Sequence, residues 1–160
     1  RQDLRVVGYN GNTRSGYETG ALLQGIQTFF GPLKTEGAVL VGLGNLGRAL
    51  VTYFAFRNAG PVIQAAFDID PAKIGRSYGG CLCFDLDHMA AFVQERGIRL
   101  GIIAVPSPDA QAVAVAMRDA GIRGILNFTP AAVHPGESVF VENIDLNRTF
   151  EKIAYFAQKI

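Results

Sequence analysis

The sequence predicts an α/β fold, with a Rossmann-like, mostly parallel sheet and helices on both of its faces. From residue 37 onward, apolar runs typical of buried strands alternate with segments of helical apolar spacing. Strands separated by helices are joined by right-handed crossovers, which make neighbouring strands parallel. The first apolar run also leads directly into a Gly-x-Gly-x-x-Gly turn and an apolar helix start, as the first unit of such a sheet does.

The composition fits one ordered domain of ordinary size. Of the 160 residues, 49% are hydrophobic and 18% are charged, which excludes a disordered chain. The formal net charge of +1 gives no overall basic field that would favour nucleic acid. No apolar run is long enough to span a bilayer, and no secretory signal opens the chain. We therefore expect a cytoplasmic protein with no membrane partner.

The two cysteines and two histidines do not predict a metal site. We expect Cys81 and Cys83 to be reduced, buried residues of a strand, because a disulfide between residues two apart would be strained. His88 and His134 stand isolated from each other and from the cysteines, so no zinc site is completed and we expect no metal.

Each element is justified by its local pattern. Residues 1–16 are rich in glycine and asparagine and predict turns. A helix is expected at 21–30, with Thr19 as its cap and Gly31 and Pro32 as its stop. Apolar runs predict strands at 37–42, 61–68, 81–84, 99–105, 122–126 and 138–142. Helical spacing predicts helices at 45–59, 86–96, 107–120 and 144–160, with Ser107 as the cap of the third.

The turn after the first strand has the spacing of a dinucleotide-binding fingerprint. Gly42 allows a tight turn, Gly44 removes a Cβ that would block a diphosphate, and Gly47 lets the helix approach the sheet. The N–H groups and the dipole at the helix start favour an anion. The expected cofactor-binding residues of this segment are Gly42, Leu43, Gly44, Asn45, Leu46 and Gly47. The alternative is an ordinary strand-to-helix turn without a ligand.

Asp68 stands at the end of the second predicted strand, 26 positions after Gly42, near the spacing of about 20 that is usual for a ribose-binding carboxylate. A carboxylate there accepts hydrogen bonds from the ribose hydroxyls of NAD(H) and repels the 2′-phosphate of NADP(H). The alternative is that Asp68 or Asp70 only opens the turn before Pro71. We expect Asp70 to open the turn and Asp68 to bind the sugar.

Two later strand ends are expected to line the nicotinamide half of the same site. Val105 and Pro106 end the fourth predicted strand, and Asn127 ends the fifth. In a doubly wound sheet the ligand lies across the carboxyl ends of the strands, where the strand order reverses. The alternative for Pro106 and Pro130 is that they only terminate strands.

No catalytic residues are predicted. An NAD-dependent oxidoreductase needs a proton donor or base near the nicotinamide and usually a separate substrate domain. His134 is the one histidine after the fifth predicted strand, in an expected loop, and His88 is expected on a helix surface. A dinucleotide site without catalytic groups indicates a sensor that binds the cofactor without transforming it.

Several segments resemble the Rex family of redox-sensing transcriptional repressors, which have an N-terminal winged helix and a C-terminal Rossmann domain. The resemblance covers nearly all of the chain, and its last segment is the most specific to the family. The segments are 1–4, 16–17, 41–49, 67–75, 120–128 and 141–146. The resemblance implies a winged-helix remnant at 1–16, a linker helix at 17–36, an NAD(H)-binding domain at 37–143 and a C-terminal helix at 144–160.

The predicted last helix carries apolar residues on two sides. One stripe consists of Leu146, Phe150, Ile153, Ala157 and Ile160. Tyr155 and Ile144 project from the opposite side. A terminal surface helix needs only one apolar face, so a second one favours a partner subunit. The resemblance implies a homodimer in which this helix is swapped into the partner's cleft. The alternative is a single helix buried in its own domain.

The resemblance also implies that bound NADH closes the dimer and weakens operator DNA binding, while NAD⁺ competes for the same pocket. Tyr17 and Asp145 stand where family members pair a tyrosine with an aspartate, and such a charge-assisted hydrogen bond suits a two-state switch. Phe150 belongs to the same dimer and switch region. Nearly all of the winged helix is missing before Arg1, so we expect a fragment of a repressor that binds DNA through that part.

Two other functions are left open. One is a small NAD-dependent oxidoreductase module. The other is a CoA-binding domain of the acyl-CoA ligase type, which shares a Rossmann-like layout and a glycine turn. Asp68 disfavours CoA, because CoA carries a 3′-phosphate near that region.

Overall fold

The computed structural model describes residues 19–20, 23, 36–56 and 60–159. The chain divides into two units, Arg1–Lys34 and Thr35–Ile160. In the first unit, the described residues Thr19, Gly20 and Leu23 are helical, so Thr19 is itself a helical residue, whereas the sequence predicts it as a cap. The other residues of the helix predicted at 21–30, and the turns predicted at 1–16, lie outside the described residues.

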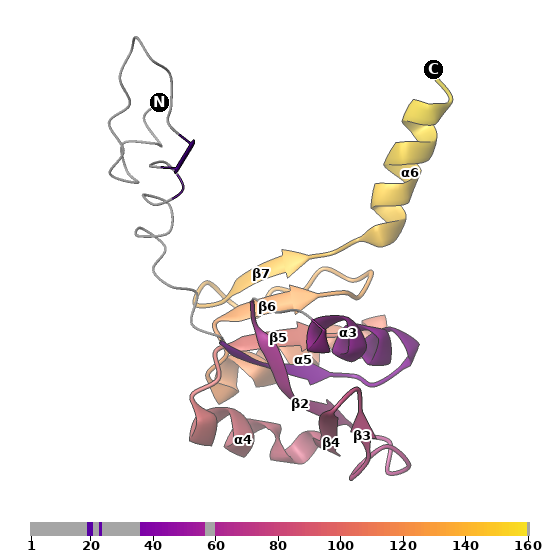
Figure 1. Ribbon diagram of the computed structural model, residues 1–160. Helices are drawn as coiled ribbons and strands as arrows, with labels where there is room; N and C mark the ends of the chain where they lie inside the picture. Colours follow the sequence, from indigo (N-terminus) through magenta and orange to yellow (C-terminus); the bar gives the residue numbers. More distant parts are fainter. Residues whose placement is uncertain (1–18, 21–22, 24–35, 57–59, 160) are drawn as a thin grey trace. The chain divides into compact units, whose positions relative to one another are not determined.

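The second unit is built around a sheet with the strand order β3-β4-β2-β1-β5-β6-β7 (Figure 1). The strands are β1 (Gly37–Val41), β2 (Val62–Asp68), β3 (Ser77–Tyr78), β4 (Cys81–Asp85), β5 (Leu100–Ile103), β6 (Gly124–Asn127) and β7 (Phe140–Asn143). All pairings are parallel except that of β3 with β4. The strand order reverses at β1, which pairs with β2 on one side and with β5 on the other. The predicted Rossmann-like sheet is confirmed.

β3 is the strand that the sequence does not predict. It has two residues and forms a hairpin with β4 through Gly79 and Gly80, whose φ angles are 55° and 84°. Two residues with positive φ suit the tight turn of a two-residue hairpin. A two-residue strand is too short to show a period of apolar side chains, so no sequence pattern predicts it.

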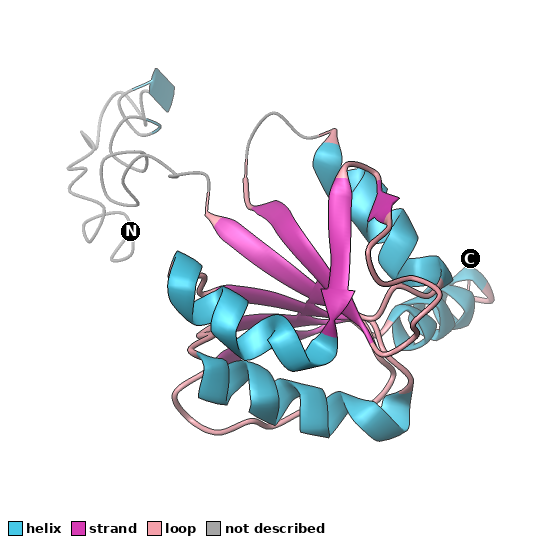
Figure 2. Cartoon of the chain, turned by 90° about the horizontal axis from the view of Figure 1, so that it is seen from below, coloured by secondary structure: helices cyan, strands magenta, loops and turns pink. Residues whose placement is uncertain are grey.

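Helices cover both faces of the sheet (Figure 2). The covering elements are α3 (Asn45–Ala55) on one face, and the 3₁₀ turn η1 (Leu86–His88), α4 (Met89–Arg96) and α5 (Ser107–Ala120) on the other. The last helix, α6 (Leu146–Ala157), has no buried residue. On one face, Leu50 of α3 belongs to the same buried cluster as Leu40 of β1. On the other face, Val93 of α4 and Val113 of α5 share a cluster with Val39 of β1. Successive strand residues point to opposite faces, which is why β1 is apolar throughout.

The helix predicted at 107–120 is observed with those bounds, but its predicted cap and the starts of two other predicted helices differ from the structure. The helix predicted at 86–96 begins as the 3₁₀ turn η1 and continues as α4. Ser107 is the first residue of α5 rather than its cap, and the N-cap residue Pro106 has no side chain that could accept a hydrogen bond. The last helix starts at Leu146, because the Asp145 carboxylate accepts a hydrogen bond from a backbone N–H of the first turn.

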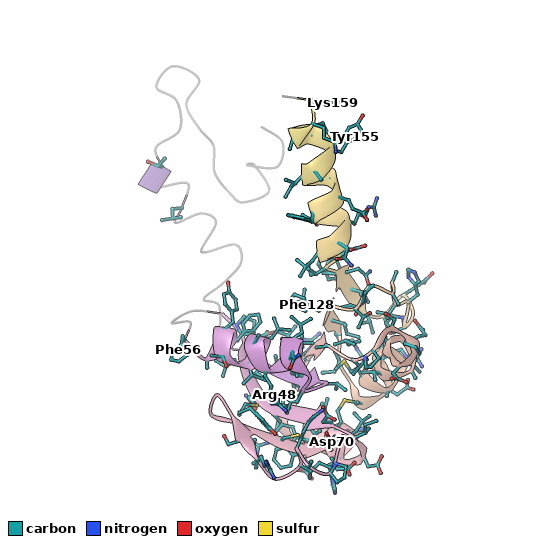
Figure 3. All side chains as sticks on the ribbon, turned by 90° about the vertical axis from the view of Figure 1, so that its right-hand side faces the viewer. Arg48, Phe56, Asp70, Phe128, Tyr155 and Lys159 are labelled. Atoms are coloured by element: carbon teal, nitrogen blue, oxygen red, sulfur yellow. The ribbon has the colours of Figure 1, made fainter. Side chains whose placement is uncertain are left out.

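α6 leaves the sheet after β7, and none of its described side chains is buried (Figure 1). Leu146 is 61%, Phe150 72% and Ile153 57% exposed. Tyr155 and Lys159 mark the far end of the helix in Figure 3, where the Lys159 ammonium lies 4.3 Å from the centre of the Tyr155 ring. The apolar stripe is therefore not buried within this chain, contrary to the alternative of a helix packed in its own domain.

Candidate functional site

A cavity of about 490 Å³ lies at the carboxyl ends of β1, β2 and β5. Its walls come from the turn after β1, the segment after β2, the start of η1, the end of β5 and the first turns of α5. The lining residues are Val41, Gly42, Gly44, Asp68, Ile69, Asp70, Lys73, Leu86, Ala104, Val105, Pro106, Asp109, Ala112 and Val113. The cavity thus flanks the point where the strand order reverses, the usual ligand position in an open α/β sheet.

The three glycines of the turn each have a separate structural reason. Gly42 has a φ of 100°, and a Cβ there would lie 2.5 Å from the carbonyl oxygen of Ala104. A Cβ on Gly47 would collide with the carbonyl oxygen of Gly42, so only glycine allows α3 to approach the turn this closely. A Cβ on Gly44 would meet no atom within 4 Å. Packing within the chain therefore explains Gly42 and Gly47 but not Gly44, which borders open space in the cavity.

The start of α3 offers a site for an anion. Its N-cap residue, Gly44, makes no side-chain cap bond, and no acidic residue lies in the first turn. The first helical bond runs from the Arg48 N–H to the Gly44 carbonyl at 3.1 Å. The N–H groups of Asn45, Leu46 and Gly47 precede that bond at the positive end of the helix dipole. This arrangement suits a phosphate group.

Asp68 is the buried carboxylate of the cavity, with a side chain that is only 7% exposed. Its Oδ2 accepts hydrogen bonds from the Leu43 N–H at 2.7 Å and from Lys73 Nζ at 2.9 Å. Its Oδ1 accepts one from the Asp70 N–H at 2.9 Å. The first of these bonds ties the glycine turn to the end of β2, so the diphosphate and ribose candidates form one connected unit.

The turn after β2 uses both of its aspartates. Asp70 accepts a hydrogen bond from the Ala72 N–H at 2.9 Å, which confirms its expected role in opening the turn. Asp68 also supports the turn through its bond from the Asp70 N–H. Asp68 therefore both supports the turn and lines the cavity.

The hydrogen bonds keep Asp68 ionised. Burial by itself would raise the pKa of Asp68, but the bonds from Asp70, Lys73 and Leu43 outweigh burial and hold it below the ordinary value of 3.8. The pKa of Lys73 is raised above 10.5, chiefly by its hydrogen bond to Asp68. The two groups therefore remain a charged pair at neutral pH.

Lys73 is a site residue that the sequence analysis does not single out. Its ammonium is 2.9 Å from Asp68 Oδ2 and 3.6 Å from Asp70 Oδ2. Lys73 lies five positions after Asp68, and the turn opened by Asp70 brings it back to that carboxylate. The contact between Lys73 and Asp68 depends on the geometry of this turn, which residue spacing alone does not specify.

Val105 and Pro106 line the same cavity as Asp68. They are expected at the nicotinamide half, whereas in the structure they share one cavity with Asp68, the carboxylate expected to bind the adenosine ribose. The reason is the strand order: β5 and β2 both flank β1, so their carboxyl ends face each other across the glycine turn. With Ile69, Leu86 and Val113 they give the cavity an apolar wall suited to a flat base.

Asn127 does not line the cavity. It is fully buried, and its Nδ2 donates to the Ala131 carbonyl at 2.7 Å and to Asn143 Oδ1 at 2.8 Å. Its Oδ1 accepts from the N–H and the hydroxyl of Thr129. The amide is therefore saturated by protein groups and holds the loop between β6 and β7.

The predicted switch residues are only partly described. Tyr17 lies outside the described residues, so its pairing with Asp145 remains a prediction. The Asp145 carboxylate accepts a hydrogen bond from the Arg148 N–H at 2.9 Å and caps α6. Phe150 is exposed on the same helix.

The cysteines and histidines among the described residues do not form a metal site. The described residues include no group of three or more His, Cys, Asp or Glu side chains placed to hold a metal ion. Cys81 and Cys83 are free and buried, as expected, and His88 and His134 are exposed. Within the ranges given above, no helix is both long enough and apolar enough to cross a membrane.

Comparisons with known proteins agree with this geometry. The family profile described as the CoA binding domain matches residues 34–131. The redox-sensing transcriptional repressor Rex of Chloroflexus aurantiacus is 38% identical over 156 residues, which cover 98% of this chain and 74% of the relative.

Solved structures agree as well. The Rex-family repressor RSP, in complex with β-NAD⁺ and operator DNA, matches with a TM-score of 0.88 and 30% identity over 99% of this chain and 73% of RSP. RSP in complex with β-NADH matches with a TM-score of 0.83 and 29% identity, over 99% of this chain and 74% of RSP.

Proposed function

The chain belongs to the Rex family of redox-sensing transcriptional repressors, and we propose that it senses the balance of NADH and NAD⁺ through the cavity beside β1, β2 and β5. One observation carries the proposal. The open space at Gly44 and the buried Asp68 carboxylate lie on the same cavity. In a Rossmann sheet, a bound dinucleotide places its diphosphate at the glycine turn and its adenosine ribose at the acidic residue that follows the second strand.

The residues present fit such a ligand. The first turn of α3, together with Gly42 and Gly44, would hold the diphosphate, because free N–H groups and the helix dipole face it. Asp68 would accept hydrogen bonds from the adenosine ribose. The apolar wall formed by Val105, Pro106 and their neighbours would contact the adenine. The chain thus binds and orients the nucleotide, as expected of a sensor in a family of repressors rather than of an enzyme.

We propose that the protein is a homodimer that uses α6 as its main contact. Leu146, Phe150, Ile153 and Phe156 are all more than half exposed in the isolated chain. An apolar helix face of this kind costs free energy in water and favours an apolar partner. A helix swapped between two copies would cover this apolar face. Tyr17 would then meet Asp145 at the start of α6.

RSP binds operator DNA in one of its structures. We place the DNA contacts of this repressor in a winged helix on the N-terminal side of the Rossmann domain, and we propose that NADH weakens DNA binding while NAD⁺ permits it. The site of action is then the cytoplasm, where NAD(H) and the chromosome are both accessible.

The test uses the full-length repressor and operator DNA selected from a random-sequence pool by the NAD⁺-bound protein. Fluorescence anisotropy of labelled DNA is followed while NADH is added at constant NAD⁺. We expect release of the DNA as NADH rises, and an Asp68→Ala variant should need more NADH for the same release. DNA binding that is indifferent to NADH, in a protein shown to bind the DNA, would refute the sensor function.

CoA is the second candidate ligand, because the profile of the CoA binding domain covers residues 34–131. The charge of the cavity disfavours it. Three aspartates and one lysine line the walls, and the 3′-phosphate of CoA would add negative charge beside them. Binding of CoA in competition with NADH distinguishes the two ligands.

A further inference from the structure

We infer that Lys73 is a specificity-determining residue of the nucleotide site: it shares the Asp68 carboxylate with the sugar, and its charge sets how strongly the site excludes a 2′-phosphate. This inference rests on the proposed function and extends it from the class of ligand to the choice between NADH and NADPH.

Asp68 has few hydrogen-bonding positions left for a sugar. A carboxylate has about four acceptor positions, and three of them are used by Leu43, Lys73 and Asp70. A ribose that binds through two hydroxyls needs two positions, so it must take one of those three. The N–H groups of Leu43 and Asp70 are fixed by the backbone of the two turns. Lys73 is the donor that can move.

The Lys73 ammonium can shift without leaving the cavity. Lysine has a flexible four-carbon stem and three donors, and the Lys73 side chain is 20% exposed. It can therefore yield one position on Asp68 Oδ2 and remain beside the sugar, because Asp70 Oδ2, already 3.6 Å from the ammonium, offers a second anionic partner. Lys73 is thus a counter-ion that stays in the site when the ribose binds.

Lys73 also changes the charge of the cavity wall. Among the described residues that line the cavity, Lys73 is the one cation, and it stands among Asp68, Asp70 and Asp109. A 2′-phosphate adds a charge of about −1.5 to −2 near neutral pH, whereas the ribose of NADH adds none. Lys73 therefore offsets much of the repulsion that a 2′-phosphate meets, and it has little such effect on NADH.

The experiment measures the Kd of NADH and of NADPH for the wild type, Lys73→Met and Lys73→Arg, using the fluorescence of the reduced nucleotide. The quantity compared is the ratio of the NADPH Kd to the NADH Kd. Lys73→Met should raise this ratio on the order of tenfold, the usual size for losing one charge-assisted contact. Lys73→Arg keeps the charge and should leave the ratio within about threefold.

A matched control is Arg99→Met, which removes an exposed cation that is not part of the cavity wall, and it should leave the ratio unchanged. The ratio is measured within each variant, so a smaller folded fraction affects both nucleotides equally and cancels. If Lys73→Met weakens both nucleotides in parallel, Lys73 is only structural and the inference is wrong. If the wild type binds neither nucleotide, the proposed function itself fails, so the two failures are distinguishable.

Discussion

Gly44 and Gly47 allow a direct separation of ligand binding from folding. Gly44 has a φ of −70°, which any residue can adopt, and a Cβ there meets nothing within 4 Å. Gly44→Ala removes a favourable N-cap residue, at a cost of about 0.5–1 kcal/mol. It also lowers the entropy of the unfolded chain, which returns about 0.4–1 kcal/mol. We expect the free energy of unfolding to change by less than about 1 kcal/mol.

The same methyl group occupies the open space where the diphosphate would lie. We therefore expect Gly44→Ala to weaken NADH binding by at least about tenfold, which corresponds to about 1.4 kcal/mol. Gly47→Ala should behave in the opposite way. Its Cβ would collide with the Gly42 carbonyl, so α3 must move, and overpacking of this kind costs about 1–3 kcal/mol or more of stability.

The assay combines urea unfolding followed by far-UV circular dichroism with titration of NADH by its own fluorescence. The expected result is a folded Gly44→Ala variant with poor binding and a destabilised Gly47→Ala variant. If Gly44→Ala binds NADH as tightly as the wild type, the turn is an ordinary strand-to-helix connection and the diphosphate site is wrong.

Three further predictions follow from the structure. The pKa of Asp68 is lowered and that of Lys73 is raised in the folded protein. Their ion pair therefore contributes fully to the free energy of unfolding between about pH 5 and 9, and this contribution is lost as pH falls through the folded pKa of Asp68. Asp68→Asn should therefore cost about 1–2 kcal/mol of unfolding free energy at pH 7 and progressively less as the pH is lowered below about 4. A cost in urea unfolding that does not fall with decreasing pH would contradict this. Burial raises the pKa of Cys81 to about 11, with a smaller effect of the neighbouring Cys83. Iodoacetamide at pH 8 should therefore label Cys81 about 100-fold more slowly in the folded protein than in the urea-unfolded protein. Equal labelling rates would refute the burial. Phe150→Ser should convert the dimer to a monomer, as measured by light scattering. Asn147→Ser, which changes an exposed polar residue of the same helix, should leave the dimer intact. A Phe150→Ser protein that remains dimeric would exclude α6 as the main contact.

The sequence was informative where structure depends on neighbouring residues. The strand, the glycine turn and the start of α3 are adjacent in the chain, so their spacing carries the geometry. Asp68 could be predicted because it directly follows the apolar run of a strand, and that strand pairs with β1 in the structure. The fold class followed from the alternation of these units.

Other features depend on contacts that no local pattern records. The role of Lys73 depends on a turn that brings it back to Asp68, and Asn127 is removed from the cavity by its bonds to Ala131, Thr129 and Asn143. Each of these contacts joins loops whose paths are set by the packed sheet. Residue type at a strand end therefore predicts a pocket position only when the loop that follows leaves the side chain free.

The most direct test of the central claim is isothermal titration of the chain with NADH, NAD⁺, NADPH and CoA, in parallel for the wild type and Asp68→Ala. If the glycine turn and Asp68 together hold an NAD(H) molecule, NADH binds most tightly to the wild type, and Asp68→Ala lowers that affinity by about tenfold or more. Binding of CoA or NADPH that equals or exceeds that of NADH, or an NADH affinity unchanged by Asp68→Ala, would contradict the account.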